Sequence, residues 1–215
     1  MQDSGNRKRY DKFSYIYDWT GDYPYHQVRQ NAIDKLQLQE GDVVVDLFCG
    51  TGINFGYILD HIGDTGEIIG VDGSAGMLQR AEQRVKKKKW DTKRIQLLEQ
   101  DLRYIDEDFF STTLPESHTS KVLITLGLSA ISNWADVFDR LYLAAAAGTR
   151  FSIMDIYCEK PTLSAKVINY IGSSDCARKV WEPLKAKSLD YQEEWYCPFR
   201  VLKVSVIVAS GVKRE

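Results

Sequence analysis

Two carboxylates and two glycines are spaced as a ligand site would require. Asp46 follows the apolar run Val43–Val45, and Gly50 and Gly52 come shortly after it. Glycines this close let the backbone turn sharply and approach a ligand, because they carry no Cβ. Asp72 follows a second apolar stretch about 20 residues after Gly52, the place of an acid that accepts hydrogen bonds from ribose hydroxyls. The pattern indicates a site for a cofactor that contains a ribose.

The glycine turn departs from the dinucleotide-binding fingerprint. That pattern needs a Gly or Ala three residues after the second glycine, so that the helix packs closely and its N-terminus holds a pyrophosphate. Phe55 stands at that position, and Gly56 comes one residue late. The carboxylate of Asp46 would also repel a pyrophosphate, whereas it suits a cation. A cofactor with an ammonium group and a sulfonium centre fits these residues better than NAD.

Alternating strands and helices are expected to position these residues. A β-branched run such as 43–45 prefers a buried strand, and the segment after the glycines predicts a short helix. This strand, turn and helix form the first unit of a doubly wound α/β sheet, whose ligands bind beyond the strand ends. We expect strands at 43–45, 67–71, 95–99, 121–125, 149–156, 191–197 and 199–210, with Pro198 between the last two. We expect helices at 26–36, 53–61, 74–88, 133–147, 162–171 and 175–187, and irregular chain at 104–116.

The stretch Asp46–Gly52, which reads D-L-F-C-G-T-G, resembles the first motif of class I S-adenosylmethionine-dependent methyltransferases. The family's fuller form is an acid followed by alternating glycines, and Phe48 replaces the first of these. Asp72 resembles the family's ribose-binding acid, and Asp101 resembles the residue that accepts from the adenine amino group. The order of strands and helices matches the family over nearly the whole chain. The resemblance implies an α/β fold: a doubly wound, Rossmann-like, seven-stranded sheet, mostly parallel, with an antiparallel C-terminal hairpin.

The resemblance further implies an enzyme that uses S-adenosyl-L-methionine and no metal. In the family, an apolar side chain after the second strand packs on the adenine, and Gly73–Leu78 resembles this segment. The backbone beside the acid after the third strand often donates to the ring. The alternative is a non-catalytic partner protein that binds the cofactor without transferring its methyl group. The residues expected to bind the cofactor are Asp46, Phe48, Gly50, Thr51, Gly52, Asn54, Asp72, Gly73, Met77, Asp101, Leu102 and Thr125.

A single domain is expected over residues 1–215, with residues 1–38 as an N-terminal helical lid segment. Aromatic residues recur at helical spacing from Tyr10 to Trp19. Such a segment could simply pack on an edge of the sheet, but the resemblance implies that it also covers the site. We therefore expect two catalytic candidates. Tyr17 would lie near the methyl group, and His26, a residue type that titrates near neutrality, could take a proton from an amine acceptor.

Composition and charge narrow the class of protein. A net charge of −2 and a pI near 6.0 argue against a general nucleic-acid binder. No apolar run is long enough to span a membrane, and no secretory signal is recognisable. The basic run Lys86–Lys89 is typical of a solvated helix end, or at most of peripheral contact with anionic lipid. The scattered cysteines predict reduced thiols in a cytoplasmic protein, rather than disulfides or a zinc site, at Cys49, Cys158, Cys176 and Cys197.

The segment after the fourth strand bears on the methyl acceptor. Enzymes that methylate exocyclic amino groups of bases carry an Asn/Asp/Ser-Pro-Pro-aromatic turn there, whereas Thr125–Leu128 contains no proline. The first motif also occurs in some RNA C-methyltransferases, but those need a nucleophilic cysteine. We expect the one candidate, Cys158, to be a packed or inert thiol.

Two segments resemble enzymes with other acceptors. Tyr15–Thr20 and Leu128–Trp134 are similar to segments of bacterial phospholipid and betaine-lipid N-methyltransferases, and the quinone C-methyltransferases are a neighbouring match. We therefore expect a small-molecule or lipid acceptor and no nucleic acid. N-methylation of an amino lipid is the leading hypothesis, and quinone-type C-methylation is the alternative.

Overall fold

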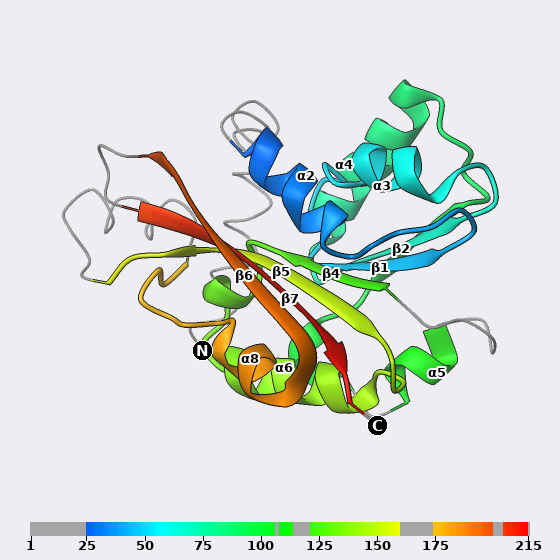
Figure 1. Ribbon diagram of the computed structural model, residues 1–215. Helices are drawn as coiled ribbons and strands as arrows, with labels where there is room; N and C mark the ends of the chain where they lie inside the picture. The colour runs from blue at the N-terminus through cyan, green and yellow to red at the C-terminus, as the bar shows by residue number, and fades with distance from the viewer. Residues whose placement is uncertain (1–24, 106–107, 114–120, 160–173, 200–203, 215) are drawn as a thin grey trace.

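One seven-stranded sheet organises the described residues of the computed structural model, which are 25–105, 108–113, 121–159, 174–199 and 204–214. The strands are β1 (Val43–Leu47), β2 (Glu67–Asp72), β3 (Ile95–Glu99), β4 (Lys121–Thr125), β5 (Arg150–Tyr157), β6 (Ser188–Phe199) and β7 (Val204–Lys213). Their order is β3-β2-β1-β4-β5-β7-β6 (Figure 1). The strands β1 to β5 pair in parallel, whereas β7 is antiparallel to β5 and β6. The predicted fold class is therefore confirmed.

The central strands are covered on both faces. Every residue of β1 is buried, as expected of a parallel strand between two layers of helices. Alternate side chains of a strand point to opposite faces. Val44 therefore packs in one core cluster with Ile68 and Leu123, while Val45 and Ile69 belong to the other cluster.

Helices form a layer on each face of the sheet (Figure 1). On one face lie α2 (His26–Asp34), α3 (Phe55–Ile62) and α4 (Ala75–Lys88); on the other lie α5 (Phe109–Thr113), α6 (Trp134–Ala144) and α8 (Glu182–Lys187). Two short 3₁₀ turns, η1 (Leu102–Tyr104) and η2 (Leu128–Ala130), follow β3 and β4. The sheet reverses its strand order between β1 and β4, which is where ligands bind in folds of this kind.

The orientation of α2 brings its first residues to this edge. Ser152, within β5, donates to the backbone oxygen of Ala32 at 2.6 Å. Lys121, the first residue of β4, donates to the oxygen of Leu36 at 3.2 Å. The end of α2 therefore lies at the amino ends of the parallel strands, and its start lies at their carboxyl ends.

Some predicted boundaries were wrong. The predicted helix at 175–187 begins only at Glu182, because the amide of Asp175 bonds to the oxygen of Ser129 at 2.8 Å and so fastens this stretch to the segment after β4. The chain at 104–116 was expected to be irregular but contains α5, whose two phenylalanines are buried. The helix predicted at 133–147 is α6, which ends at Ala144, because the backbone of Ala145 is already extended. The N-cap residue of α6, Asn133, makes no side-chain capping bond.

The C-terminal strand pair differs in one detail. Pro198 was expected between the two strands but lies inside β6. An edge strand accepts proline because its amide need not join the ladder. The predictions for Tyr17, for most of the 1–38 lid and for the helix at 162–171 fall outside the described residues.

The expectation of reduced thiols is wrong for one pair of cysteines. Cys158 and Cys176 form a disulfide, with Cα atoms 5.2 Å apart. The amide of Cys158, just after β5, donates to the oxygen of Cys176 at 2.7 Å, so the backbone brings the two together across a separation of 18 residues. Cys49 and Cys197 remain free thiols. A disulfide between these cysteines does not favour the expected cytoplasmic location, because disulfides persist mainly in oxidising compartments.

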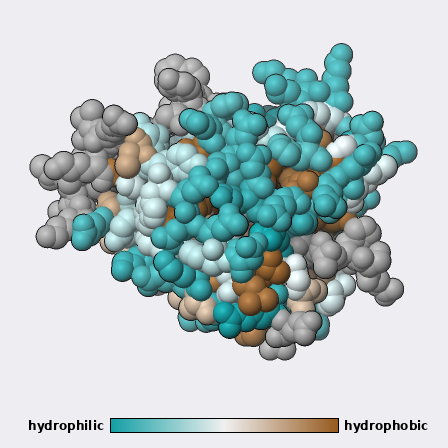
Figure 2. Space-filling view, in the orientation of Figure 1, coloured by the Kyte–Doolittle hydropathy of each residue, from teal (hydrophilic) through white to brown (hydrophobic). Residues whose placement is uncertain are grey.

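The surface shown in Figure 2 is mostly hydrophilic, with small apolar areas between polar ones. The basic run Lys86–Lys89 is exposed and ends α4, with Lys89 in the left-handed region at φ 57°. Cations favour this end of a helix because they complement its dipole.

In the part of the chain that the structure describes, no helix has the length and apolar character needed to cross a membrane.

Candidate cofactor-binding site

A buried polar network joins four elements at the carboxyl edge of the sheet. The side-chain amide of Asn54 donates to both carboxylate oxygens of Asp46, at 3.1 and 3.0 Å, and to Thr125 Oγ1 at 3.0 Å. Arg29 Nη1 of α2 donates to Asn54 Oδ1 at 2.7 Å. All four side chains are buried. The network therefore fixes the loop after β1 against both β4 and α2.

Burial dominates the electrostatics of Asp46. Loss of water raises its pKa from 3.8 to about 7, although the hydrogen bond from Asn54 and the charge of Arg29 oppose this shift. The negative charge of Asp72 adds a smaller upward effect. A cation bound nearby would favour the ionised form of Asp46.

The glycine turn leaves room for a ligand at one position. Gly50 and Gly52 have positive φ angles of 56° and 72°, as the spacing of the glycines suggested. A Cβ placed on Gly50 would meet no atom of the described residues within 4 Å, whereas one on Gly52 would lie 2.6 Å from the ring of Phe55. Gly50 thus has open space beside it, and Gly52 is needed for packing.

Phe48 replaces the glycine of the motif and takes its conformation, with φ 57°. Its ring packs beside Gly127, where an added Cβ would lie 2.3 Å from Phe48 Cγ. The glycine after β4 therefore compensates for the bulky residue after β1.

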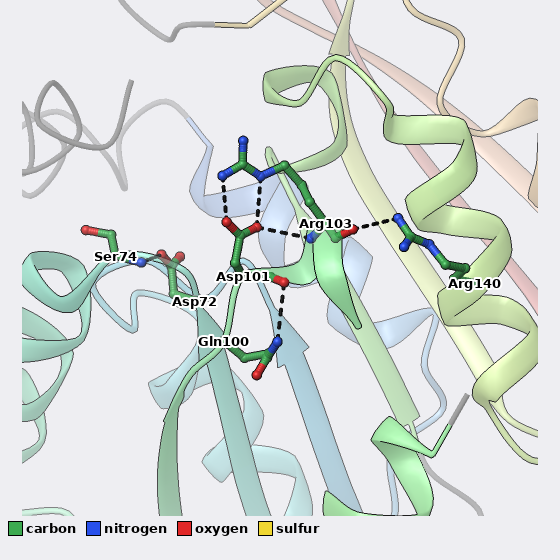
Figure 3. A network of polar contacts seen from close by, with 6 residues as sticks. All are labelled: Asp72, Ser74, Gln100, Asp101, Arg103 and Arg140. Atoms are coloured by element: carbon green, nitrogen blue, oxygen red, sulfur yellow. Dashed lines mark hydrogen bonds and ion pairs between the residues drawn. The ribbon is translucent and has the colours of Figure 1, made fainter. Parts of the chain in front are cut away.

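Asp72 at the end of β2 holds two turns together. Its carboxylate oxygens accept hydrogen bonds from the amides of Gly50 and Ser74, each at 2.9 Å. Ser74 in turn caps α4 by accepting from the amide of Met77 at 3.2 Å. Met77 is buried beside this cap. Figure 3 shows Asp72 and Ser74 next to the segment that follows β3.

That segment begins with Asp101, which caps η1. Asp101 Oδ1 accepts from the amide of Arg103 at 3.1 Å and from its Nε at 2.9 Å, and Oδ2 accepts from its Nη2 at 2.5 Å (Figure 3). The side chain of Leu102 points into the core and is 2% exposed. Only the backbone of Leu102 is thus placed to serve a ligand.

The structure brings the described candidates from the first four strands to one edge of the sheet. Leu47 of β1 stands in register with Val71 of β2 and Ile124 of β4, so Asp46, Asp72 and Thr125 lie near the carboxyl ends of adjacent strands. Thr51 and Gly73 lie in the connecting turns. His26 is exposed at the start of α2, and its Nδ1 lies 2.5 Å from the hydroxyl of Tyr57 of α3.

Two buried charged residues near this edge of the sheet, Arg29 and Asp155, were not predicted from the sequence. Arg29 is 5% exposed, although an arginine on an amphipathic helix is usually solvated. Asp155 of β5 is fully buried, and it accepts from the amide of Ser129 at 3.0 Å and from its hydroxyl at 2.6 Å. Burial raises the pKa of Asp155 to about 6, against the hydrogen bonds from Ser129 and Ile156. The position of Asp155 inside the apolar segment 149–156 is the sequence feature that could have identified it as a candidate.

Comparison with known proteins agrees with this geometry. A family model described as "Methyltransferase domain" matches residues 44–147, which hold the glycine turn and the acids after β2 and β3. The 23S rRNA (uracil(1939)-C(5))-methyltransferase RlmD of Acinetobacter baylyi is 52% identical over 56 residues, which are 26% of this chain and 12% of that protein. The demethylmenaquinone methyltransferase of Geobacillus sp. is 24% identical over 156 residues, which are 73% of this chain and 61% of that protein.

The chain thus spans only part of the length of these relatives. Among solved structures, phosphoethanolamine N-methyltransferase 2 of Haemonchus contortus superimposes with a TM-score of 0.72 at 17% identity, over 95% of this chain and 58% of that one. This likeness shows a shared fold. Residues 44–147 of this chain therefore match a methyltransferase domain, and the described residues share the fold of a solved methyltransferase.

Proposed function

We propose that the protein transfers a methyl group from S-adenosyl-L-methionine to a small molecule or lipid head group. One observation carries the proposal: Asp46, Asp72 and Asp101 lie at the ends of three adjacent strands, around a glycine turn with open space at Gly50. This arrangement offers acceptors for the hydroxyl and amino groups of a nucleoside and negative charge for a cation.

The residues at this edge fit the cofactor by their chemistry. Asp72 would accept from the ribose hydroxyls, and Asp101 from the adenine amino group, with the backbone of Leu102 beside it. The buried carboxylate of Asp46, whose pKa is raised to about 7, would gain from a cationic ligand. Gly50 would let the ligand approach the backbone, since a Cβ there would fill the open space.

The cofactor, when bound, supplies a methyl group made electrophilic by its sulfonium centre. The chain's own residues then have to orient the acceptor and exclude water, which are effects of proximity and desolvation. His26 is a candidate for removing a proton from an amine acceptor, and the hydroxyl of Tyr57 would fix its ring. Tyr17 is the second catalytic candidate.

An amino-bearing head group is the leading acceptor. The chain lacks the proline-rich turn of base N-methyltransferases after β4. The Haemonchus protein with the same fold was solved with phosphomonomethylethanolamine, a small amine that carries a phosphate. A small polar amine of this kind, free or as part of a lipid head group, suits a protein whose surface in Figure 2 is mostly hydrophilic.

Two other acceptors have specific support. The demethylmenaquinone methyltransferase relative, which covers most of this chain, favours a quinone-type ring carbon. The RNA methyltransferase relative favours uracil, but its match is short. Of the four cysteines, Cys158 and Cys176 are joined in a disulfide, and burial raises the pKa of Cys49 well above its usual value. The two disulfide-bonded sulfurs carry no free thiolate, and the buried Cys49 thiol is a poor nucleophile.

The deciding experiment follows a labelled methyl group. The protein is incubated with labelled cofactor and, separately, extracted lipids, phosphoethanolamine, demethylated quinones and ribosomal RNA. We expect label in the amine or lipid arm, and much less label with Asp72→Ala at limiting cofactor, because this variant should bind the cofactor more weakly by about 1.5–3 kcal/mol after losing hydrogen bonds to a charged group. Label in the RNA arm alone would overturn the acceptor proposal. Binding without transfer in any arm would favour a non-catalytic partner.

A further inference from the structure

An ion pair within one turn of chain controls the orientation of Asp101. The guanidinium of Arg103 meets the carboxylate side-on, with Nε 2.9 Å from Oδ1 and Nη2 2.5 Å from Oδ2 (Figure 3). The two side chains are only 20% and 21% exposed. A bidentate pair of this kind fixes the plane of the carboxylate as well as its position, because two parallel bonds prevent rotation.

The ion pair is braced by helix α6, which packs in the same core cluster as Leu102 and Ile105. Arg140 of α6 donates from Nη2 to the backbone oxygen of Arg103 at 2.7 Å. Arg140 Nε also donates to the oxygen of Asp136, one turn earlier in the same helix, at 3.3 Å. The position of Arg103, and through it that of Asp101, is thus tied to a helix that begins directly after the segment following β4.

We propose that Arg103 is a positioning residue for recognition of the cofactor's base. It holds the Asp101 carboxylate at the angle needed to accept from a 6-amino group, and so sets a preference for adenine over a 6-oxo purine. The inference rests on the proposed function. An ionised carboxylate offers about four acceptor positions, so a bidentate arginine and an incoming amino group can share it. A 6-oxo purine would instead place its acceptor oxygen next to the acceptor oxygens of the Asp101 carboxylate, and no hydrogen bond could form.

A different role would leave a different signature. If the guanidinium merely filled the space of the base, its removal would strengthen binding of any nucleoside ligand. If the ion pair only stabilised the fold, its removal would weaken binding of adenine and 6-oxo ligands equally.

The test is calorimetric titration of the full chain with S-adenosylhomocysteine and with S-inosylhomocysteine. The wild type should prefer the adenine compound by roughly 10- to 100-fold, the value expected of one hydrogen bond to a charged group. Arg103→Gln should remove most of this preference by weakening only the adenine compound. Arg103→Lys keeps the charge but loses the two-bond geometry, so it should lose part of the preference, and it serves if the Gln variant does not fold.

Arg150→Gln is the matched control. Arg150 forms a comparable pair with Asp190 at 2.8 Å, but at the amino end of β5. This variant should keep the wild-type preference. Tighter binding by Arg103→Gln, or an unchanged preference, would overturn the inference while leaving the proposed function intact. If the wild type bound neither compound, the proposed function would fail as well.

Discussion

Asn54 donates one side-chain amide to both carboxylate oxygens of Asp46, at 3.1 and 3.0 Å, in the buried centre of the site. Its own oxygen accepts from Arg29 at 2.7 Å. Asn54 therefore connects the carboxylate of Asp46 to the guanidinium of Arg29. The arrangement fixes the orientation of the buried carboxylate and moderates the cost of its burial.

Replacing Asn54 by Leu should destabilise the fold. The change leaves buried polar groups of Asp46 and Arg29 without the amide, and each such group costs about 1–3 kcal/mol. We expect the free energy of unfolding in urea to fall by at least about 2 kcal/mol. Asn133→Leu is the control, because the side chain of Asn133 makes no capping bond. Equal losses in the two variants would contradict the importance of the network.

Stability should depend on pH through Asp46 and Asp155. Their pKa values are raised from 3.8 to about 7 and about 6, so the folded state binds protons more tightly than the unfolded state. Their contribution to stability is complete below about pH 4 and is lost as pH rises to about 7. Urea unfolding from pH 4.5 to 7.5 should show Asp46→Asn gaining on the wild type as pH rises. A constant difference would exclude the raised pKa.

Breaking the disulfide should lower stability. Cys158 and Cys176 close a loop with a separation of 18 residues, for which about 3 kcal/mol is expected from the restricted unfolded chain. The double variant Cys158→Ser/Cys176→Ser, or the wild type under reducing conditions, should show a lower midpoint of thermal unfolding. Cys197→Ser, which changes an exposed free thiol, should not. If reductant has no effect on the wild type, the bond is absent or contributes nothing.

Gly50→Ala should weaken ligand binding, whereas its effect on stability should match that of a similar substitution outside the site. The change introduces an alanine at φ 56°, which costs about 1 kcal/mol, and its methyl group fills the open space at the site. Gly41→Ala, at φ 85°, adds similar strain in the turn that precedes β1. We expect similar losses of stability but weakened binding of S-adenosylhomocysteine only for Gly50→Ala. Equal affinities would place the ligand elsewhere.

Removing residues 1–20 tests the predicted lid. The aromatic segment Tyr10–Trp19 should cover the site, so the truncated protein should keep its fold but lose most of its methyl-transfer rate. Circular dichroism measures the fold, and the labelled-methyl assay measures the transfer rate. The variant Tyr17→Phe in the full chain tests the contribution of the hydroxyl group by itself. Full activity after truncation would show that the segment serves packing only.

Local chemistry along the chain determined the first half of the site. The run Val43–Val45 could only be a buried strand, and the two glycines after it permitted one kind of turn. Asp46 and Asp72 were therefore predictable, because each stands at the end of an apolar run and parallel strands present their ends at one edge. The hydrogen bonds that Asp72 accepts from the amides of both turns follow from that same adjacency.

Only the tertiary structure decided which distant residues complete the site. Arg29 reaches Asn54 because α2 packs across β5 with its start at the carboxyl edge. Asp155 bonds to Ser129 because β4 and β5 are neighbours. The amide of Asp175 also bonds to the oxygen of Ser129, which places Cys176 next to Cys158. These contacts depend on the order of strands in the sheet and on the direction in which a helix lies. Hydrophobic periodicity cannot encode them, since it specifies which face of an element is buried but not which element covers it.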